Sequence, residues 1–275
     1  MRLGERGSER PAVRHGGGVF DLSGLTADVT GDFLGDGGLD RVRAAVASGS
    51  LPALAEGAPR VGAPVAKPGA VICIGQNYAA HAAESGSAPP ERPIIFFKHP
   101  NTVVGPNDDV VIPPGATKVD WEVELAVVIG KQARYLSSPE EALSHVAGYA
   151  IANDVSERSL QLEQSGGQWS KGKSAETFNP LGPWLAVDVE DPQKLGLRSW
   201  VNGERRQDST TADMVFSVAR LVFDLSQYLV LDPGDVINTG TPEGVALGGK
   251  YPYLSSGDVV ELEIDGLGRQ RQLIR

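Results

Sequence analysis

The sequence predicts a β-rich protein built from many short strands joined by turns, and two features of its 275 residues support this. The 34 glycines and 19 prolines make 53 residues that interrupt helices, which is more than a helix bundle tolerates. Short apolar runs bounded by Gly, Pro and Asn recur along the chain, as expected for strands between turns. Hydrophobic residues make up 41% of the chain, enough for a sizeable core.

Residues 1–66 are expected to form a small N-terminal module, because they are richer in Gly, Ala and Arg than the rest and poorer in strong β-formers. Two short runs, at 11–13 and 19–22, flank three glycines and predict a hairpin. The apolar spacing at 39–47 predicts a helix. This module is expected to precede a larger domain.

A proline-rich linker is expected at 51–68, and the main domain is expected to cover 67–275. Asn202-Gly203 between two strand-like runs predicts a type I′ hairpin, because both residues tolerate positive φ. Other short apolar runs bounded by turn residues predict strands. These are expected at 71–74, 93–98, 110–112 and 235–237.

Helical signals in the main domain are few. Residues 78–84 can form a helical turn. Ser138 to Glu141 form a capping box with Pro at the first helical position, which predicts a helix that ends near His145. An apolar stripe at 218–229 predicts a core-facing helix capped by Ser217.

The charge balance argues against two classes of partner. The 25 Lys and Arg residues against 35 Asp and Glu residues give a net charge of −10, which repels a phosphate backbone and an anionic membrane surface. No stretch approaches the roughly 20 apolar residues of a spanning helix, and the first residues carry no apolar signal region. The single Cys73 cannot form an intramolecular disulfide. We therefore expect a cytoplasmic protein without a nucleic-acid or membrane partner.

The segment 119–130 contains two acidic residues in a strand-like pattern. With a period of two, its apolar residues fall on one face and must be buried, while Glu122 and Glu124 fall on the other. Carboxylates at i and i+2, roughly 7 Å apart at Cα, repel each other unless solvent or a cation lies between them. The acidic face is therefore either a solvated outer face or a cation site. The apolar residues that continue the acidic face favour the cation site.

A magnesium site needs a further oxygen ligand beyond these two carboxylates. Asp154 ends a short apolar run, where an acid can project into a pocket. An acid at a strand end also serves as a turn residue or a helix N-cap, so the pattern alone leaves its role open.

Five segments resemble, in order and in spacing, the conserved motifs of the fumarylacetoacetate hydrolase family. They are 75–84, 120–130, 153–158, 172–174 with 180–183, and 239–245. The resemblance covers about residues 68–275. The first 66 residues are similar to the variable N-terminal module of many members.

The resemblance implies a compact, β-rich α+β fold with several short mixed sheets and few helices, assembled as a homodimer and dependent on Mg²⁺ or Mn²⁺. The metal ligands implied by the likeness are Glu122, Glu124 and Asp154. The implied catalytic residues are the dyad His81 and Glu84, together with Lys173. The implied substrate contacts are Arg158, Gln161 and Thr241. One departure is Glu157, where many members have a small residue, and an acid there is expected to lower the positive potential beside Arg158.

The implied chemistry suits these residue types. A 2-oxo acid can chelate a cation through its carboxylate and keto oxygens, and the cation stabilises the enolate that forms when the C3–C4 bond of an acylpyruvate breaks. An imidazole oriented by a carboxylate can take a proton from water, and the i, i+3 spacing places His81 and Glu84 on one side of a helical turn.

Simpler interpretations stand beside the catalytic ones. His81 can be an exposed helical histidine, Lys173 a solvated lysine, and the turn at Thr241 only a sharp chain reversal. Three other residues rank lower as site candidates: His99, His145 and Lys171.

Three functions are compatible with the sequence. The first is a metal-dependent hydrolase that cleaves the C–C bond of an acylpyruvate, a small anionic 2-oxo acid. The second is decarboxylation or tautomerisation of oxaloacetate, or dehydration of a 2-keto-3-deoxy sugar acid, through the same enolate. The third is a non-catalytic, metal-stabilised oligomer, which the retained dyad and lysine disfavour. Motifs of serine hydrolases, P-loop proteins and structural zinc sites are absent from the sequence.

Overall fold

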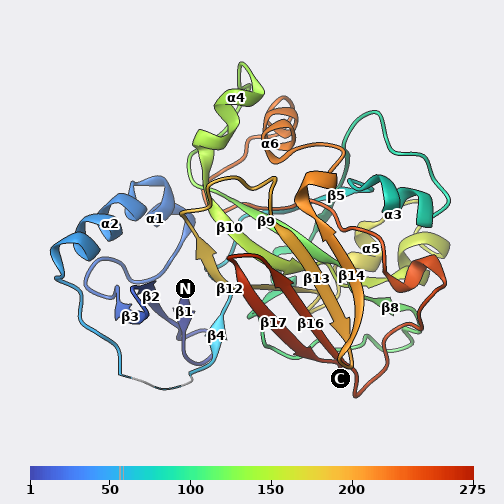
Figure 1. The fold of residues 1–275 in the computed structure, drawn as a ribbon, viewed down its shortest axis with the longest axis horizontal. Coiled ribbons are helices and arrows are strands. Elements are labelled where there is room, and N and C mark those ends of the chain that lie inside the picture. Colours follow the sequence, from blue (N-terminus) through green and yellow to red (C-terminus); the bar gives the residue numbers. More distant parts are fainter. Residues whose placement is uncertain (56, 58) are drawn as a thin grey trace.

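The computed structural model describes residues 1–55, 57 and 59–275, and its centre is a seven-stranded mixed sheet (Figure 1). The strand order is β6 (Ile94–Lys98), β5 (Val71–Gly75), β15 (Val236–Asn238), β9 (Val123–Ile129), β10 (Val146–Asn153), β12 (Asn179–Ala186) and β7 (Val103–Val104). Strand β9 lies in the middle and is antiparallel to both neighbours. All residues of β9 are buried, so both faces of the sheet are covered there.

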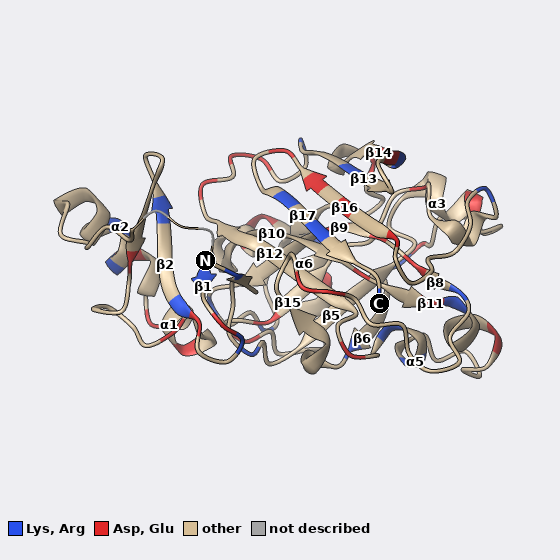
Figure 2. Cartoon of the chain, turned by 90° about the horizontal axis from the view of Figure 1, so that it is seen from below, with Lys and Arg blue, Asp and Glu red and all other residues tan. Residues whose placement is uncertain are grey.

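A four-stranded antiparallel sheet packs against one face of the central sheet. Its order is β14 (Glu204–Thr210), β13 (Gly196–Val201), β16 (Val259–Ile264) and β17 (Gly268–Leu273). The core between the sheets includes Leu125 of β9, Leu197 of β13 and Leu262 of β16, all fully buried. Figure 2 shows acidic and basic residues beside one another on β16 and β17. Arg269 of β17 and Glu261 of β16 form one such ion pair. The β-rich α+β fold predicted from the sequence is confirmed.

The N-terminal residues form a second four-stranded sheet at one end of the molecule (Figures 1 and 2). The order is β3 (Gly18–Asp21), β2 (Arg10–His15), β1 (Arg2–Leu3) and β4 (Val61–Gly62), with helices α1 (Gly31–Gly35) and α2 (Gly38–Ser48) beside it. The predicted hairpin is confirmed, since β2 and β3 pair around Gly16 and Gly17, which both take positive φ. The helix predicted at 39–47 is α2.

The N-terminal sheet and helices also pack onto the central sheet. Phe33 and Leu34 of α1 belong to one hydrophobic cluster with Val128 of β9 and Leu181 of β12. Because this core is shared, independent folding of the N-terminal module stays a prediction. Of the linker expected at 51–68, residues 56 and 58 lie outside the described part of the chain.

The remaining elements are short and surround the central sheet. The α-helices are α3 (Ala79–Glu84), α4 (Pro139–Ala142), α5 (Ser170–Lys173) and α6 (Val218–Ser226). Single turns of 3₁₀-helix lie at Pro100–Thr102, Leu143–His145, Thr211–Asp213 and Ala246–Gly248, and a π-helical turn lies at Ser159–Glu163. Strand β8 (Val119–Asp120) pairs with β11 (Ser156–Glu157). Among the described residues, every helix is too short or too polar to cross a lipid bilayer.

Most of the elements predicted for the main domain are confirmed. Strands β5, β6 and β15 lie where apolar runs predicted strands, and α3 lies within the predicted helical turn. Asn202 and Gly203 join β13 to β14 with φ of 52° and 80°, as a type I′ turn requires. The hydroxyl of Ser217 accepts a hydrogen bond from the backbone N–H of Arg220 and caps α6.

The strand predicted at 110–112 is wrong. Val110 forms only an isolated bridge with Ile274, and residue 112 donates one further hydrogen bond to the carbonyl of Arg275. The ladder does not continue because Pro113 and Pro114, which follow, have no backbone N–H.

The predicted strand at 119–130 is divided into β8 and β9. Side chains interrupt the ladder: Asp120 accepts a hydrogen bond from the N–H of Trp121, and the amide oxygen of Asn153 accepts one from the N–H of Glu122. The predicted apolar face is nevertheless fully buried. Its residues are Trp121, Val123, Leu125, Val127 and Ile129.

The capping box predicted at Ser138 has a different partner. The carboxylate of Glu141 accepts hydrogen bonds from the backbone N–H and the hydroxyl of Ser137, at 3.1 and 2.8 Å, and the side chain of Ser138 caps nothing. The helix itself forms at 139–142 and tightens into a 3₁₀ turn that ends at His145.

Candidate active site

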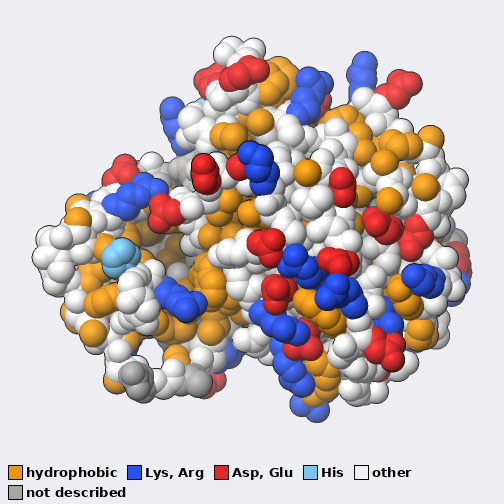
Figure 3. All heavy atoms as spheres, in the orientation of Figure 1, with side chains coloured by type: hydrophobic (Ala, Val, Ile, Leu, Met, Phe, Trp, Pro, Cys, Tyr) orange, Lys and Arg blue, Asp and Glu red, His pale blue; other side chains and the backbone are white. Residues whose placement is uncertain are grey.

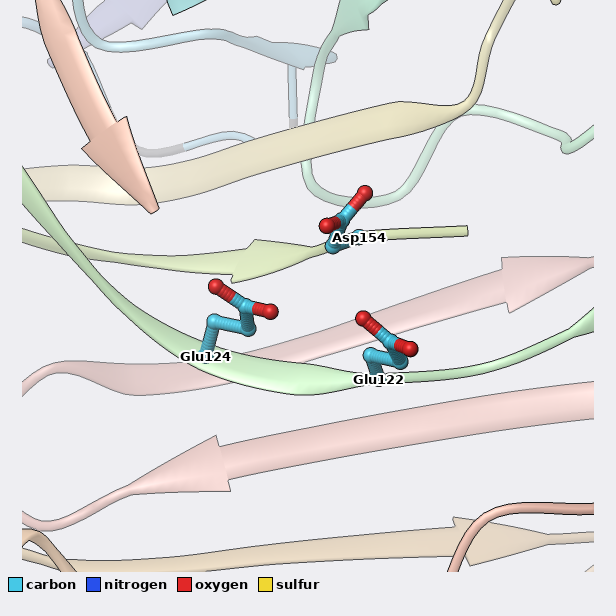
Figure 4. A group of neighbouring side chains, drawn as sticks. All are labelled: Glu122, Glu124 and Asp154. Atoms are coloured by element: carbon cyan, nitrogen blue, oxygen red, sulfur yellow. The ribbon is translucent and has the colours of Figure 1, made fainter. Parts of the chain in front are cut away.

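Three buried carboxylates converge at the adjacent ends of two paired strands (Figure 4). Glu122 precedes β9, Glu124 lies in it, and Asp154 follows the antiparallel strand β10. One carboxylate oxygen of each residue lies within 4.8 Å of the others. Glu122 is 4% exposed, Glu124 1% and Asp154 0%, so this is not the solvated outer face that the strand pattern left open.

Three buried cations hold this acid cluster together. The ammonium of Lys173 lies 2.7 Å from a carboxylate oxygen of Glu122 and 3.0 Å from one of Asp154. Lys98 pairs with the other oxygen of Asp154 and donates to the carbonyl of residue 155 at 3.0 Å. Arg158 places Nη2 2.7 Å from Glu122 Oε1. The alternative of a solvated Lys173 is therefore excluded.

The charges of this cluster do not balance. Its four carboxylates are the three above and that of Asp120, which lies 2.8 Å from Arg158, and its three cations leave one negative charge in excess. Burial and the neighbouring carboxylates of Asp154 and Glu122 raise the pKa of Glu124 well above its usual value. Burial acts in the same direction on Glu122, but Lys173 and Arg158 outweigh it and hold its pKa below the usual value.

The donor set suits a hard divalent cation. The carboxylate of Glu124 accepts a hydrogen bond from the N–H of Gly240 at 2.7 Å, but within the described residues no lysine or arginine pairs with it. A divalent cation bound among Glu122, Glu124 and Asp154 would more than offset the single excess negative charge of the ionised cluster, and carboxylate oxygens are the ligands that Mg²⁺ and Mn²⁺ prefer.

A histidine and a glutamate lie on one side of helix α3, close to the acid cluster. His81 is 6% exposed, and its Nδ1 lies 3.6 Å from Glu84 Oε2, a contact longer than a hydrogen bond. Both oxygens of Glu84 accept from the N–H of Gly244 at 3.1 Å. Burial alone would raise the pKa of Glu84, but the His81 ring and the Gly244 N–H outweigh it and lower the pKa. His81 is thus not the exposed helical histidine of the simpler interpretation.

One cavity of about 290 Å³ brings most of the predicted site residues together. Those that line it are His81, Glu84, Glu122, Glu124, Arg158, Gln161, Lys173 and Thr241. Asp154 is fully buried and does not line it.

A larger hollow of about 1270 Å³ lies elsewhere, between the N-terminal module and residues 184–195 (Figure 3). It contains none of the predicted site residues, so its size does not make it the candidate site.

The predicted substrate contacts Arg158 and Thr241 use some of their hydrogen-bonding groups within the protein. Arg158 donates through Nη1 to the side-chain oxygen of Gln161 at 2.9 Å and through Nε to Asp120 at 2.8 Å. The hydroxyl of Thr241 donates to the carbonyl of residue 123 and accepts from Gln207. Its hydrogen is therefore used within the protein, so contact with a substrate is left to other atoms of Thr241.

The carboxylate of Glu157, the departure noted in the sequence, accepts hydrogen bonds from the backbone N–H groups of residues 117, 118 and 160. It lines no part of the cavity. The carboxylate of Glu157 therefore serves to hold the local backbone.

The sequence did not predict two charged residues of the cluster, Lys98 and Asp120. Lys98 is the one charged residue in the run 93–98, aligned by a period of two with the buried Phe96, which is a signal that a basic side chain points inward. Asp120 precedes Glu122 by two residues. Of the residues ranked lower, His99 and Lys171 are exposed, and the ring of His145 bonds to backbone carbonyls.

Comparison with known proteins identifies the family. The family model described as fumarylacetoacetate (FAA) hydrolase C-terminal matches residues 70–275. The chain belongs to the fumarylacetoacetate hydrolase family. The match begins just before β5 and covers every residue of the acid cluster and the dyad, so the candidate site lies wholly within the family domain.

Relatives and solved structures agree with this membership of the fumarylacetoacetate hydrolase family. A Burkholderia multivorans protein provisionally named a hydrolase is 49% identical over 100% of this chain and 98% of its own. The fumarylacetoacetate hydrolase of Exiguobacterium antarcticum has a TM-score of 0.85 at 36% identity, covering 100% of this chain and 98% of that one. Maleylpyruvate hydrolase from Sphingobium sp. SYK-6, solved with manganese(II) and pyruvate, has a TM-score of 0.81 at 29% identity, with coverage of 100% and 98%. Other similar structures are described as isomerases.

Proposed function

We propose that this protein is a divalent-metal-dependent hydrolase that cleaves the C–C bond of an acylpyruvate, a small anionic 2-oxo acid. The observation that carries the proposal is the His81–Glu84 pair, which faces the same cavity as the carboxylates of Glu122 and Glu124. A dyad that can activate water beside an acid cluster is the combination that hydrolysis requires.

Glu122, Glu124 and Asp154 would hold the cation, which we propose to be Mg²⁺ or Mn²⁺. When bound, the cation supplies Lewis-acid stabilisation for the negative charge that develops on the 2-oxo group as the C3–C4 bond breaks. The manganese(II) and pyruvate in the similar maleylpyruvate hydrolase structure support this assignment.

His81 would remove the proton from the attacking water. Its Nδ1 faces Glu84, which leaves Nε2 as the ring nitrogen for the water. The carboxylate of Glu84 is held by the N–H of Gly244 and keeps its charge, so it can orient the ring and stabilise the imidazolium that forms. Attack of this water would form a C–O bond at C4, and collapse of the resulting tetrahedral carbon would break the C3–C4 bond, with its electron pair passing to C3 and the 2-oxo group.

Lys173 would supply positive charge and a proton to the substrate. Burial alone would lower its pKa, but the carboxylates of Asp154 and Glu122 outweigh burial and raise it, so the ammonium remains protonated at neutral pH. A protonated amine at the cavity wall can neutralise the substrate carboxylate or return a proton to C3.

Replacing His81 by Ala tests the proposal. Removal of the general base should lower kcat/KM for pyruvate release from an acylpyruvate by about 10² to 10⁴. Mn²⁺ affinity, measured by electron paramagnetic resonance, should be unchanged, because the ligands are untouched. His99→Ala is the matched control, since His99 is exposed and lies outside the cavity. Full hydrolysis by His81→Ala would refute the assignment of the base.

A second function on the same site is supported by the similar structures described as isomerases. Tautomerisation or decarboxylation of oxaloacetate, or dehydration of a 2-keto-3-deoxy sugar acid, also passes through an enolate and needs a proton donor such as Lys173, but no attacking water. A panel of these acids and acylpyruvates, with and without EDTA, separates the functions. Metal-dependent turnover of oxaloacetate alone would favour the second.

We also propose that the protein acts in the cytoplasm as a homodimer. The lone Cys73, which is fully buried, suits a reducing compartment. The dimer rests on the family membership, and light scattering of the purified protein tests it.

A further inference from the structure

The lysine and arginine side chains that line the cavity already form ion pairs within the protein. Within the described residues, the two cations that line it are Arg158 and Lys173. Both contact the acid cluster, since each lies 2.7 Å from a carboxylate oxygen of Glu122. The same wall also carries the carboxylate of Glu84. Once the first carboxylate of a substrate lies at the cation site, where Lys173 can neutralise it, the described wall offers no further lysine or arginine to a second carboxylate, and the remaining basic side chain, His81, lies beside Glu84.

Much of the remaining wall is apolar and fixed in place. The ring of Trp169 packs edge-on against Phe96, with centroids 5.6 Å apart and an interplanar angle of 61°. Trp169 also lies against the backbone of Gly75, where a Cβ atom would come within 2.4 Å of the ring. Two leucines, Leu162 and Leu247, complete this apolar wall.

The polar groups near this wall are neutral. Gln76 has φ of 53°, in the left-handed region, and it lines the cavity. The hydroxyl of Ser85 is buried without a hydrogen-bond partner within the described structure, and Ser87 lies beside it in the wall. These groups can solvate a carbonyl or hydroxyl oxygen of a ligand, but none can neutralise a carboxylate.

We propose that this site takes acylpyruvates whose acyl group is neutral and largely apolar, and that it discriminates against substrates with a second carboxylate. The inference rests on the proposed function for the position of the first carboxylate. A second carboxylate would be desolvated against Trp169, Phe96 and Leu247 without a lysine or arginine partner, in a cavity whose wall also carries Glu84. The substrate class would then differ from maleylpyruvate, a dicarboxylate, which the name of the similar hydrolase specifies.

Binding of two non-hydrolysable ligands tests the inference without turnover. The probes 2-oxohexanoate and 2-oxohexanedioate have equal chain lengths and differ only in a terminal methyl or carboxylate group. Titration calorimetry on the Mn²⁺-loaded protein should give a Kd at least about tenfold lower for 2-oxohexanoate, because burying an unpaired charge is costly. Equal or tighter binding of 2-oxohexanedioate would overturn the inference.

A basic residue introduced into the wall should reverse the preference. Leu162 is 45% exposed and lines the cavity, so Leu162→Lys adds a cation at small cost to folding. Leu143→Lys is the matched control, since Leu143 is 42% exposed and lies outside the cavity. Leu162→Lys should tighten binding of 2-oxohexanedioate by about tenfold, the gain expected from one charge-assisted hydrogen bond, and the control should not. Equal effects of the two variants would overturn the inference.

Pyruvate release separates failure of this inference from failure of the proposed function. Faster release from a carboxylated acylpyruvate than from its neutral analogue overturns the substrate class and leaves the hydrolase assignment intact. Tighter binding of 2-oxohexanoate, without pyruvate release from either acylpyruvate, supports the substrate class of the cavity and overturns the hydrolase assignment.

Discussion

Replacing Lys98 by Met should weaken the metal-free protein and make its stability depend more strongly on a bound cation. The ammonium of Lys98 is fully buried, pairs with Asp154 and donates to the carbonyl of Val155 at 3.0 Å. Methionine has a similar length but no charge, so the variant leaves one oxygen of a buried carboxylate without its partner. Among the described residues, the carboxylate of Asp154 then keeps the contact with Lys173 alone, at 3.0 Å.

The expected loss is about 3 kcal/mol, the lower end of the range for breaking a buried ion pair, because Lys173 remains. At about 2 °C per kcal/mol for a chain of this size, the Tm of the metal-free variant should fall by about 6 °C. Mn²⁺ bound beside Asp154 restores positive charge to the cluster. The rise in Tm on adding Mn²⁺ should therefore be larger for Lys98→Met than for the wild type.

Differential scanning calorimetry of EDTA-treated protein, before and after addition of Mn²⁺, measures both quantities. Lys118→Met is the matched control, because Lys118 pairs with Glu163 at the surface, where the side chains are 36% and 55% exposed. Its Tm should equal that of the wild type, since exposed ion pairs contribute little. A metal-free Lys98→Met protein as stable as the wild type, or an unchanged response to Mn²⁺, would refute the role given to Lys98.

Three further variants test the site. The pKa of Glu84 is depressed in the folded protein, so its charge stabilises the fold above pH 4.5, its usual pKa, and this contribution is lost as the pH falls through the folded value. The difference in Tm between the wild type and Glu84→Gln should therefore shrink as the pH is lowered. A difference that stays constant with pH would contradict this. The pKa of Glu124 is raised in the folded protein, so its ionisation costs stability at neutral pH. The metal-free Glu124→Gln variant should therefore have a Tm no lower than that of the wild type, and Mn²⁺ should not raise it. A rise in Tm on adding Mn²⁺ would exclude Glu124 as a ligand. In Gly244→Ala the new Cβ would lie 2.3 Å from the carbonyl oxygen of Arg206, whereas in Gly249→Ala, also at positive φ, it would meet nothing within 4 Å. Gly244→Ala alone should therefore lose hydrolysis. Equal losses in both variants would point to backbone strain alone.

Period-two patterning predicted the local geometry of the strands but not the contacts between them. It placed Glu122 and Glu124 together, opposite an apolar face that is fully buried. The same pattern did not predict the break between β8 and β9, because that break depends on the amide of Asn153, which comes from another strand. Side chains distant in sequence thus set the local backbone.

The electrostatic partners of the acids were missed for the same reason. Lys98 and Asp154 are separated by 56 positions, and a lysine in a strand gives no sign of which carboxylate it will meet. The family resemblance named Lys173 because it matches a motif. The hydroxyl of Thr241 accepts a hydrogen bond from Gln207 in strand β14, and only the folded chain brings these two residues together.

One loop that follows β15 holds the acid of the dyad, one of the candidate metal ligands and Asp120. Its backbone N–H groups donate to the three carboxylates as follows: Gly240 to Glu124 at 2.7 Å, Gly244 to Glu84 at 3.1 Å, and Ala246 and Leu247 to Asp120 at 2.9 and 3.0 Å. Because these donors are consecutive parts of one segment, the loop fixes where the acid behind His81 lies relative to the acid at the cation site. Substitution of His81 can therefore remove water activation alone, whereas a shift of the loop must disturb the dyad and the cation site together.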